Sequence, residues 1–170
     1  MVYMNRKGIS PVIATVIIVA VAVAISIAVV GWIMGLWGTI AGGTESLKIY
    51  PDSYINSSSG VLMLHVRNTG SASAVIYKIE VAGVGSCNSN NGDIVVEPGD
   101  DIWIAVNVTK SSSIAWFYGT TLNESKIVNQ FDSGGNATCS YVGTPTAGAY
   151  YLVKVYTKAG NVYQGNVGAK

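Results

Sequence analysis

The side chains that are able to carry chemistry are few. The chain of 170 residues contains one histidine, His65, and two cysteines. A structural zinc site takes four Cys or His ligands, and a catalytic histidine works with partner groups held beside it. His65 stands in an alternating segment without a second histidine, so we expect a strand histidine that is hydrogen-bonded or at the surface. We predict no catalytic residue and no metal site.

Acidic residues gather once, at Asp93, Glu97, Asp100 and Asp101. Calcium prefers such oxygens, but the spacing lacks the regularity of a calcium loop, which favours a solvated turn. No Gly-rich phosphate loop with Lys and Ser/Thr occurs, so the chain does not power its own assembly. These patterns predict a protein that is not an enzyme and has no cofactor.

Two covalent modifications are predicted outside any active site. Cys87 and Cys139 are 52 positions apart in segments rich in Gly, Ser and Asn, which we interpret as loops. A lone pair in an exported domain usually forms a disulfide, with two free thiols as the alternative. Four Asn-X-Ser/Thr sequons predict N-linked glycans on an extracellular surface. Their acceptors are Asn56, Asn123, Asn136 and Asn107, the last ranked lowest because it falls inside a predicted strand.

The amino-acid composition restricts the classes of protein to which this chain can belong. Charged residues make up 11% of the chain and hydrophobic residues 49%, whereas an average soluble domain is roughly 25% charged. Ten Lys and Arg against nine Asp and Glu give a net charge of +1, so no basic excess is present to bind nucleic acid. The composition favours a membrane or filament protein.

The charge-free segment is the element that dominates the sequence. After Arg6 and Lys7 the next charged residue is Glu45, and residues 9–40 are almost all apolar. Their 32 residues would form a helix of about 48 Å, longer than the ~20 residues that a membrane span needs. Ser10 and Pro11 predict its start, because Ser caps free amides and Pro suits the first turn.

Small residues recur along this helix at a spacing that lets helix backbones approach closely. Apolar residues surround the helix on all sides, so periodicity does not distinguish a lipid environment from other copies of the chain. Ala and Gly are also common in transmembrane helices generally, which is the alternative explanation. The helix–helix contacts we predict involve Ile13, Ile17, Ala20, Ala24, Ala28, Gly31 and Gly35.

From residue 47 onward, short β-rich runs alternate with Gly, Asn, Ser and Pro turns. We predict strands over 47–50, 61–67, 74–81, 93–96, 101–108, 114–118, 150–157 and 161–164. Turns are predicted at residues 97–100 and around Gly160. Trp103, Trp116 and Tyr151 are expected in the core rather than on a ligand platform.

The predicted organisation has four parts: a basic leader at 1–8, a hydrophobic helix at 9–41, a Gly-rich junction at 42–46 and an all-β head at 47–170. The fold class is therefore α+β, with a long N-terminal helix followed by an immunoglobulin-like β-sandwich. Arg6 and Lys7 hold the N-terminus on the cytoplasmic side, which places the head outside.

The N-terminal motif closely resembles the precursors of archaeal type IV pilins, a family whose leader is a class III signal peptide. The motif reads Arg6-Lys7-Gly8-Ile9-Ser10-Pro11-Val12-Ile13-Ala14-Thr15-Val16. The resemblance extends to the helix, the Gly-containing junction and a head containing Val66-Arg67-Asn68-Thr69-Gly70. Bacterial pilins have Glu at the fifth mature position, whereas this chain has Ile13 there, which fits the archaeal branch.

This resemblance implies a processing step and a set of partners. A prepilin peptidase would cut between Gly8 and Ile9, with Arg6 and Lys7 as the basic residues before the cut. A separate assembly ATPase and a membrane platform protein would act on a precursor held in the cytoplasmic membrane. The mature subunits would form a helical homopolymer.

The implied function is that of the structural subunit of an extracellular adhesive pilus, which contacts surfaces or other cells. A filament subunit of the archaeal swimming organelle, the archaellum, is one alternative, and a minor pilin is another. A third is a single-pass, membrane-anchored β-sandwich that binds a partner and never polymerises.

Overall fold

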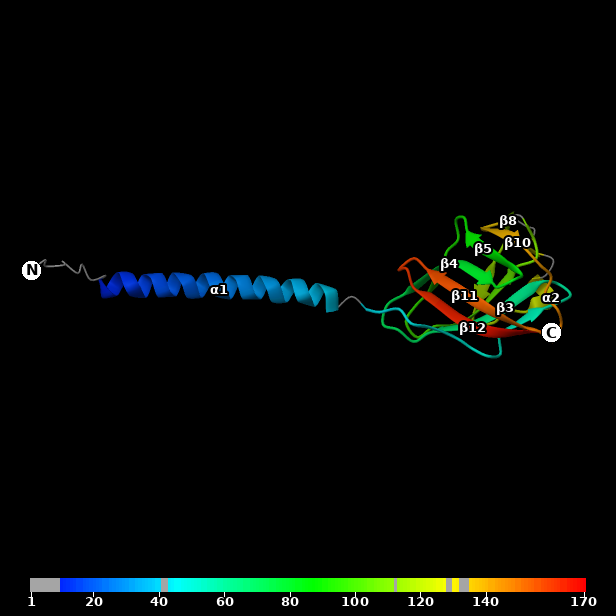
Figure 1. Ribbon diagram of the computed structural model, residues 1–170, viewed down its shortest axis with the longest axis horizontal. Helices are drawn as coiled ribbons and strands as arrows, with labels where there is room; N and C mark the ends of the chain where they lie inside the picture. The colour runs from blue at the N-terminus through cyan, green and yellow to red at the C-terminus, as the bar shows by residue number, and fades with distance from the viewer. Residues whose placement is uncertain (1–9, 41–42, 112, 128–129, 132–134) are drawn as a thin grey trace, which may run out of the picture. The chain divides into compact units, whose positions relative to one another are not determined.

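The computed structural model describes residues 10–40, 43–111, 113–127, 130–131 and 135–170. The chain divides into two compact units, Met1–Gly42 and Gly43–Lys170. Figure 1 shows the first as one long helix and the second as a β-rich domain, which we call the head. The α+β class is confirmed at this level.

The first unit consists of helix α1, Pro11–Ile40. It begins at Pro11, as predicted, and the carbonyl of Ser10 accepts hydrogen bonds from the amides of Ile13 (3.0 Å) and Ala14 (3.1 Å). Val and Ile dominate the segment and ordinarily favour strands. A helix forms because it pairs every interior backbone group within its own segment, which a single strand does not achieve.

The head is built from twelve strands and one short helix. They are β1 (Leu47–Ile49), β2 (Tyr54–Asn56), β3 (Val61–Asn68), β4 (Ala74–Val81), β5 (Gly85–Ser89), β6 (Ile94–Val96), β7 (Asp101–Asn107), β8 (Ser113–Ile114), β9 (Phe117–Gly119), α2 (Glu124–Ile127), β10 (Ala137–Tyr141), β11 (Tyr150–Thr157) and β12 (Val162–Ala169).

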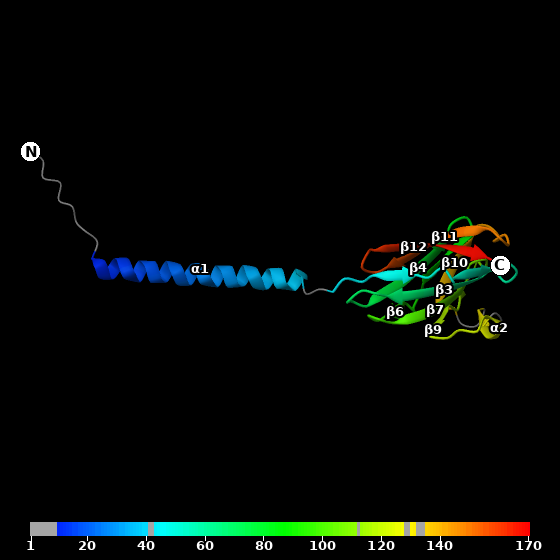
Figure 2. The same cartoon turned by 90° about the horizontal axis from the view of Figure 1, so that it is seen from below.

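All twelve strands belong to one curled sheet rather than to two separate sheets. The order is β8-β10-β5-β4-β11-β12-β2-β3-β7-β9, while β1 pairs with β3 and β6 pairs with β4. Every pairing is antiparallel except the one between β12 and β2, where Gly168 and Ala169 lie opposite Tyr54 and Ile55. This parallel pair joins the two halves that Figure 2 shows one above the other. The predicted immunoglobulin-like sandwich is therefore not confirmed.

Most predicted strands are present in the structure, which also contains three strands that were not predicted. Strands β2, β5 and β10 were not predicted, because each contains Asn, Ser or Gly in place of an apolar alternation. The predicted run at 114–118 is split between β8 and β9. Both turns are confirmed: Gly99 (φ 88°) and Gly160 (φ 90°) adopt the left-handed conformation that suits glycine.

The sequence of β4 places Val75, Tyr77, Ile79 and Val81 on one face, opposite Lys78 and Glu80, and this predicted inward face is wrong in its first half. Ala74, Ile76, Ile79 and Val81 are buried, whereas Tyr77 is exposed. The cause is an irregularity in the pairing with β11, whose register shifts between Tyr156 and Thr157. One extra residue on β4 reverses the direction of the side chains that follow it.

Both faces of β3 are buried at its beginning. Val61, Leu62, Met63 and Leu64 are all at most 2% exposed, because the segment around α2 covers the outer face. Phe131 of that segment is fully buried and meets the ring of Phe117 edge to face. Trp116 is buried there as predicted, whereas Trp103 and Tyr151 are only half-buried at the edge of the core.

Candidate functional site

Helix α1 presents its apolar side chains without any cover. The large hydrophobic residues between Val12 and Met34 are 41% to 70% exposed, and they point to every side of the helix. The stretch Pro11–Met34 is long and apolar enough to cross a membrane, by length and composition alone. Surface of this kind is covered in a functioning protein by lipid or by other protein.

The two hydroxyl groups of this stretch are hydrogen-bonded within the helix itself. The hydroxyl of Thr15 donates to the carbonyl of Val12 (2.9 Å), and that of Ser26 donates to the carbonyl of Ala22 (2.8 Å). Neither hydroxyl therefore needs a hydrogen-bond partner from outside. An apolar environment leaves neither hydroxyl unpaired.

The predicted contact residues lie along this helix. Ile13, Ile17, Ala20, Ala24, Ala28 and Gly31 are exposed, and Gly35 also belongs to the helix. A furrow of about 370 Å³ runs beside Ala20 and is lined by Thr15, Val16 and Val19. A side-chain knob from another helix fits such a furrow. The leader-processing residues Arg6, Lys7, Gly8 and Ile9 lie outside the described residues.

Where the chain enters the head, Glu45 fixes it to the β11–β12 hairpin. Its carboxylate accepts hydrogen bonds from Asn161 Nδ2 (2.8 Å) and from the hydroxyl of buried Thr157. Its carbonyl accepts one from the hydroxyl of Tyr163 (2.9 Å). Burial and the Glu45 charge raise the pKa of Tyr163. The entering segment is thus held by side chains as well as by the sheet.

Asn68 makes a second attachment at the same end of the head. Its side chain is fully buried and donates to the carbonyls of Ala72 and Val96, both at 2.8 Å. Its Oδ1 accepts from the amides of Gly70 (2.9 Å) and Ser46 (3.4 Å). One amide group therefore connects the chain entry, the turn after β3 and strand β6. Sequence reasoning quoted Asn68 within a motif but assigned it no role.

The structure joins Cys87 and Cys139 in a disulfide. The cysteines do not lie in loops as expected: they are directly opposite residues of β5 and β10, with Cα atoms 4.0 Å apart. Both segments are rich in polar residues, so the sequence did not indicate that they form strands. The bridge connects two neighbouring strands near one edge of the sheet.

The four sequons differ in the accessibility of their asparagines. Asn107 is 3% exposed, and its Nδ2 donates to the carbonyl of Ser59 (3.0 Å). Asn123 is exposed, while Asn56 and Asn136 are half-buried. The low rank given to Asn107 agrees with this burial, because the nitrogen that a glycan would join is already bonded inside the fold.

The acidic residues do not converge on one point. Asp93 pairs with Lys158, whose hydrogen bond lowers the pKa of that carboxyl, and Asp100 accepts from the amide of Glu97 (3.3 Å). Asp101 instead bonds the Nε2 of His65. Within the part of the chain that the structure describes, no group of His, Cys, Asp or Glu is arranged to hold a metal ion.

His65 has more contacts than expected for a strand histidine. Its Nδ1 lies 2.8 Å from Asp52, its Nε2 contacts Asp101, and its ring stacks on Trp103 with centroids 4.5 Å apart. The hydroxyl of buried Ser53 accepts from its backbone amide (2.9 Å). No single-sequence signal connects Asp52 to His65, because only the turn between β1 and β2 brings them together.

No protein-family model matches this sequence, and no curated protein shows significant similarity to it.

Proposed function

We propose that this protein is the structural subunit of an extracellular filament of the archaeal type IV pilin kind. The observation that carries the proposal is the uncovered, all-round apolar surface of α1 over Pro11–Met34. Its two internal hydroxyls need no external partner, so the helix suits lipid before assembly and a packed bundle of identical helices afterwards.

The cost of exposing the apolar helix surface to water favours polymerisation. Roughly 2,000 Å² of apolar helix surface, at about 25 cal/mol per Å², would cost tens of kcal/mol in water. A chain drawn out of the membrane avoids this cost when neighbouring copies cover the helix. Repeated contacts between non-equivalent surfaces of identical subunits produce an open helical filament.

The other elements of the proposal rest on the sequence resemblance. The leader would be removed between Gly8 and Ile9 by a prepilin peptidase, and a separate ATPase and platform protein would assemble the subunits. The heads would form the outer surface, carry N-linked glycans and adhere to surfaces or cells, without enzymatic activity.

An assembly experiment tests the proposal. The chain starting at Ile9 is purified in detergent, the detergent is removed, and the products are examined by electron microscopy. Ala24→Phe places a bulky side chain on the small-residue stripe and is expected to abolish filaments. Val23→Phe adds the same ring at the neighbouring position, off the stripe, and is expected to preserve them.

Two alternatives predict different results. A membrane-anchored binding domain would form no filaments from the chain starting at Ile9, with or without either phenylalanine substitution. In native cells it would stay monomeric in the membrane fraction and start at Met1 by mass spectrometry. A swimming-organelle subunit would give filaments with a different helical rise and twist. Filaments built equally well by both phenylalanine variants would contradict the role of the stripe.

A further inference from the structure

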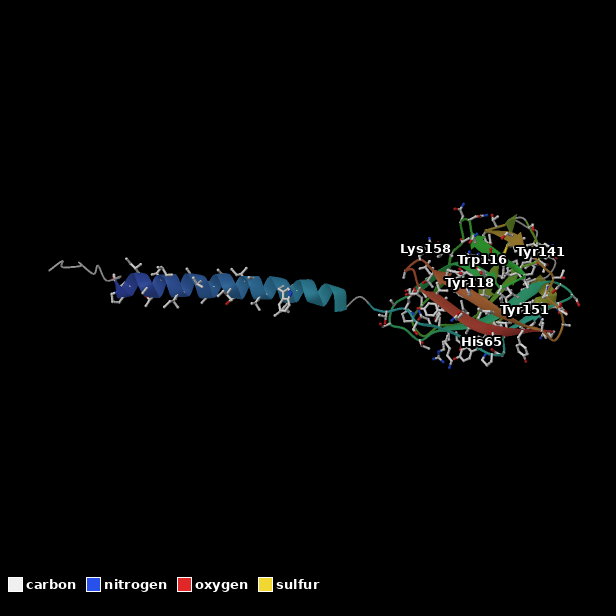
Figure 3. The ribbon with its side chains drawn as sticks, viewed as in Figure 1. His65, Trp116, Tyr118, Tyr141, Tyr151 and Lys158 are labelled. Carbon is white, nitrogen blue, oxygen red and sulfur yellow. A yellow bond between two sulfur atoms is a disulfide. The ribbon has the colours of Figure 1, made fainter. Side chains whose placement is uncertain are left out.

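The outer face of β1, β3 and β7 carries two ordered rows of side chains. Lys48, Arg67 and Asp101 are consecutive cross-strand partners and form the first row. His65 and Trp103 form the second row, two residues further along their strands. The next row, at Met63, is buried beneath the α2 segment. The first two rows remain open to solvent, and Figure 3 shows His65 on the opposite side of the head from Tyr141 in that view.

Lys48 and Arg67, the cations of the first row, are both exposed, and neither takes part in an ion pair within the described residues. The Lys48 ammonium lies 5.3 Å from the centre of the Tyr50 ring. The two cations border a hollow of about 340 Å³ whose other walls are Tyr50, the turn at Asn68–Gly70, and Gly99. Two cations that border one hollow, without an ion pair among the described residues, form a suitable site for an anionic group.

Aromatic rings continue this site along the second row. Tyr50, His65 and Trp103 lie in succession: the first pair is tilted with centroids 4.6 Å apart, and the second pair is stacked with centroids 4.5 Å apart. On its other side Trp103 lies opposite Gly119 of β9, where the side chain of Leu122 is the nearest neighbour. The indole is half-exposed, so part of it meets solvent beside the stacked His65 ring.

Carboxylates border the same rows. The side chains of Asp52 and Asp101 are 55% and 44% exposed, although each bonds His65. Exposed carboxylate oxygens accept hydrogen bonds from hydroxyl groups, whereas they repel a chain that carries a negative charge on every unit. The surroundings therefore favour a ligand rich in hydroxyls with sparse negative charge.

We propose that this face binds a carboxylated saccharide, with Arg67 and Lys48 holding a uronate carboxylate and Trp103 supporting a neighbouring sugar ring. The distance from the two cations to Trp103 suits neighbouring units of a saccharide. The two rows are about 6.6 Å apart along a strand, and neighbouring strands are about 4.8 Å apart. The inference does not depend on filament formation, since a single head carries the whole site.

The test uses the full chain in detergent micelles and isothermal titration calorimetry with an oligosaccharide that carries one glucuronate on otherwise neutral xylose units. The methyl ester of the same oligomer keeps the sugar rings and removes the charge. We expect saturable binding of the acid form, with the ester at least about tenfold weaker, because a charged hydrogen bond contributes one to two powers of ten in affinity. The double variant Lys48→Gln/Arg67→Gln should weaken the acid form by a similar factor.

Matched variants and ligands make the test specific. Lys126→Gln/Lys158→Gln removes the same charge from exposed sites elsewhere on the head and should leave the affinity unchanged. Trp103→Leu should weaken the acid and the ester alike. The proposal is overturned if no saturation occurs, if both double variants weaken binding equally, or if a single-stranded oligonucleotide of equal charge binds more tightly. Thermal unfolding of each variant identifies those that fail to fold.

Discussion

The Nδ2 of Asn161 donates a 2.8 Å hydrogen bond to the carboxylate of Glu45, across 116 residues of sequence. The same carboxylate accepts from the hydroxyl of Thr157, which is 1% exposed. The first residues of the head are thereby attached to its final hairpin. This attachment uses side chains that carry no recognisable pattern in the sequence.

Glu45→Ala should destabilise the head. The substitution leaves the buried Thr157 hydroxyl without its carboxylate acceptor, so we expect a loss of about 1–3 kcal/mol in the free energy of unfolding. Urea unfolding followed by tryptophan fluorescence measures it. Gln164→Ala, at an exposed position on β12, serves as the control and should change stability by less than about 0.5 kcal/mol. Equal stabilities for the two variants would show that Glu45 is dispensable.

Asn68→Ala should be more damaging still. It leaves the carbonyls of Ala72 and Val96 and the amide of Gly70 without partners in a buried environment. We expect a loss of about 3 kcal/mol or more, since several groups lose their hydrogen bonds together. Asn88→Ala, at an exposed position of β5, is the matched control. A melting temperature unchanged in Asn68→Ala would refute the role assigned to this amide.

Reduction of the disulfide should lower stability by about 4 kcal/mol in the chain-entropy model, given a separation of 52 residues. Chemical unfolding with and without a phosphine reductant measures the difference. A Cys87→Ala/Cys139→Ala variant should resemble the reduced protein and be insensitive to the reductant. An oxidised wild type that is no more stable than this variant would contradict the prediction.

High pH should destabilise the head through Tyr54. Burial, together with the hydrogen bond to Glu124 (2.9 Å), raises the pKa of Tyr54 from 10.0 to about 12. The neutral phenol is thus favoured in the folded state, and its contribution is complete below pH 10 and lost as the pH rises towards 12. Tyrosine NMR titration should show Glu124→Gln lowering this pKa, while Tyr118→Phe leaves it unchanged.

Glycan occupancy should follow the exposure of the asparagines. We expect modification at Asn123 and none at Asn107, whose Nδ2 is bonded to the Ser59 carbonyl within the fold. Glycopeptide mass spectrometry of protein from native cells measures both sites in one sample. A glycan on Asn107 would mean that modification precedes folding.

Elements with a strong local signal were predictable from sequence. The run of apolar residues determined α1, because its length exceeds that of any ordinary strand. Runs of β-favouring residues located β3 and β11, and the Pro98-Gly99 pair located a turn. Each of these signals depends on residues close together in the chain.

Features that depend on distant residues were not predictable. The parallel pairing of β12 with β2 joins the two expected sheets into one. No pattern of neighbouring residues in the sequence indicates this pairing. The polar strands β5 and β10 are recognisable only once the Cys87–Cys139 bridge is known. The ring of His65 obtains its carboxylate partners in the same way, from a turn and from a neighbouring strand.

The self-contained hydroxyls of Thr15 and Ser26 have a mechanical consequence. A neighbouring helix laid against Pro11–Met34 meets apolar contacts that have no preferred donor and acceptor alignment. Such a helix can slide by one turn, about 5.4 Å, without breaking a hydrogen bond between subunits. In a bundle of such helices, lengthening under tension would therefore break no hydrogen bond between subunits.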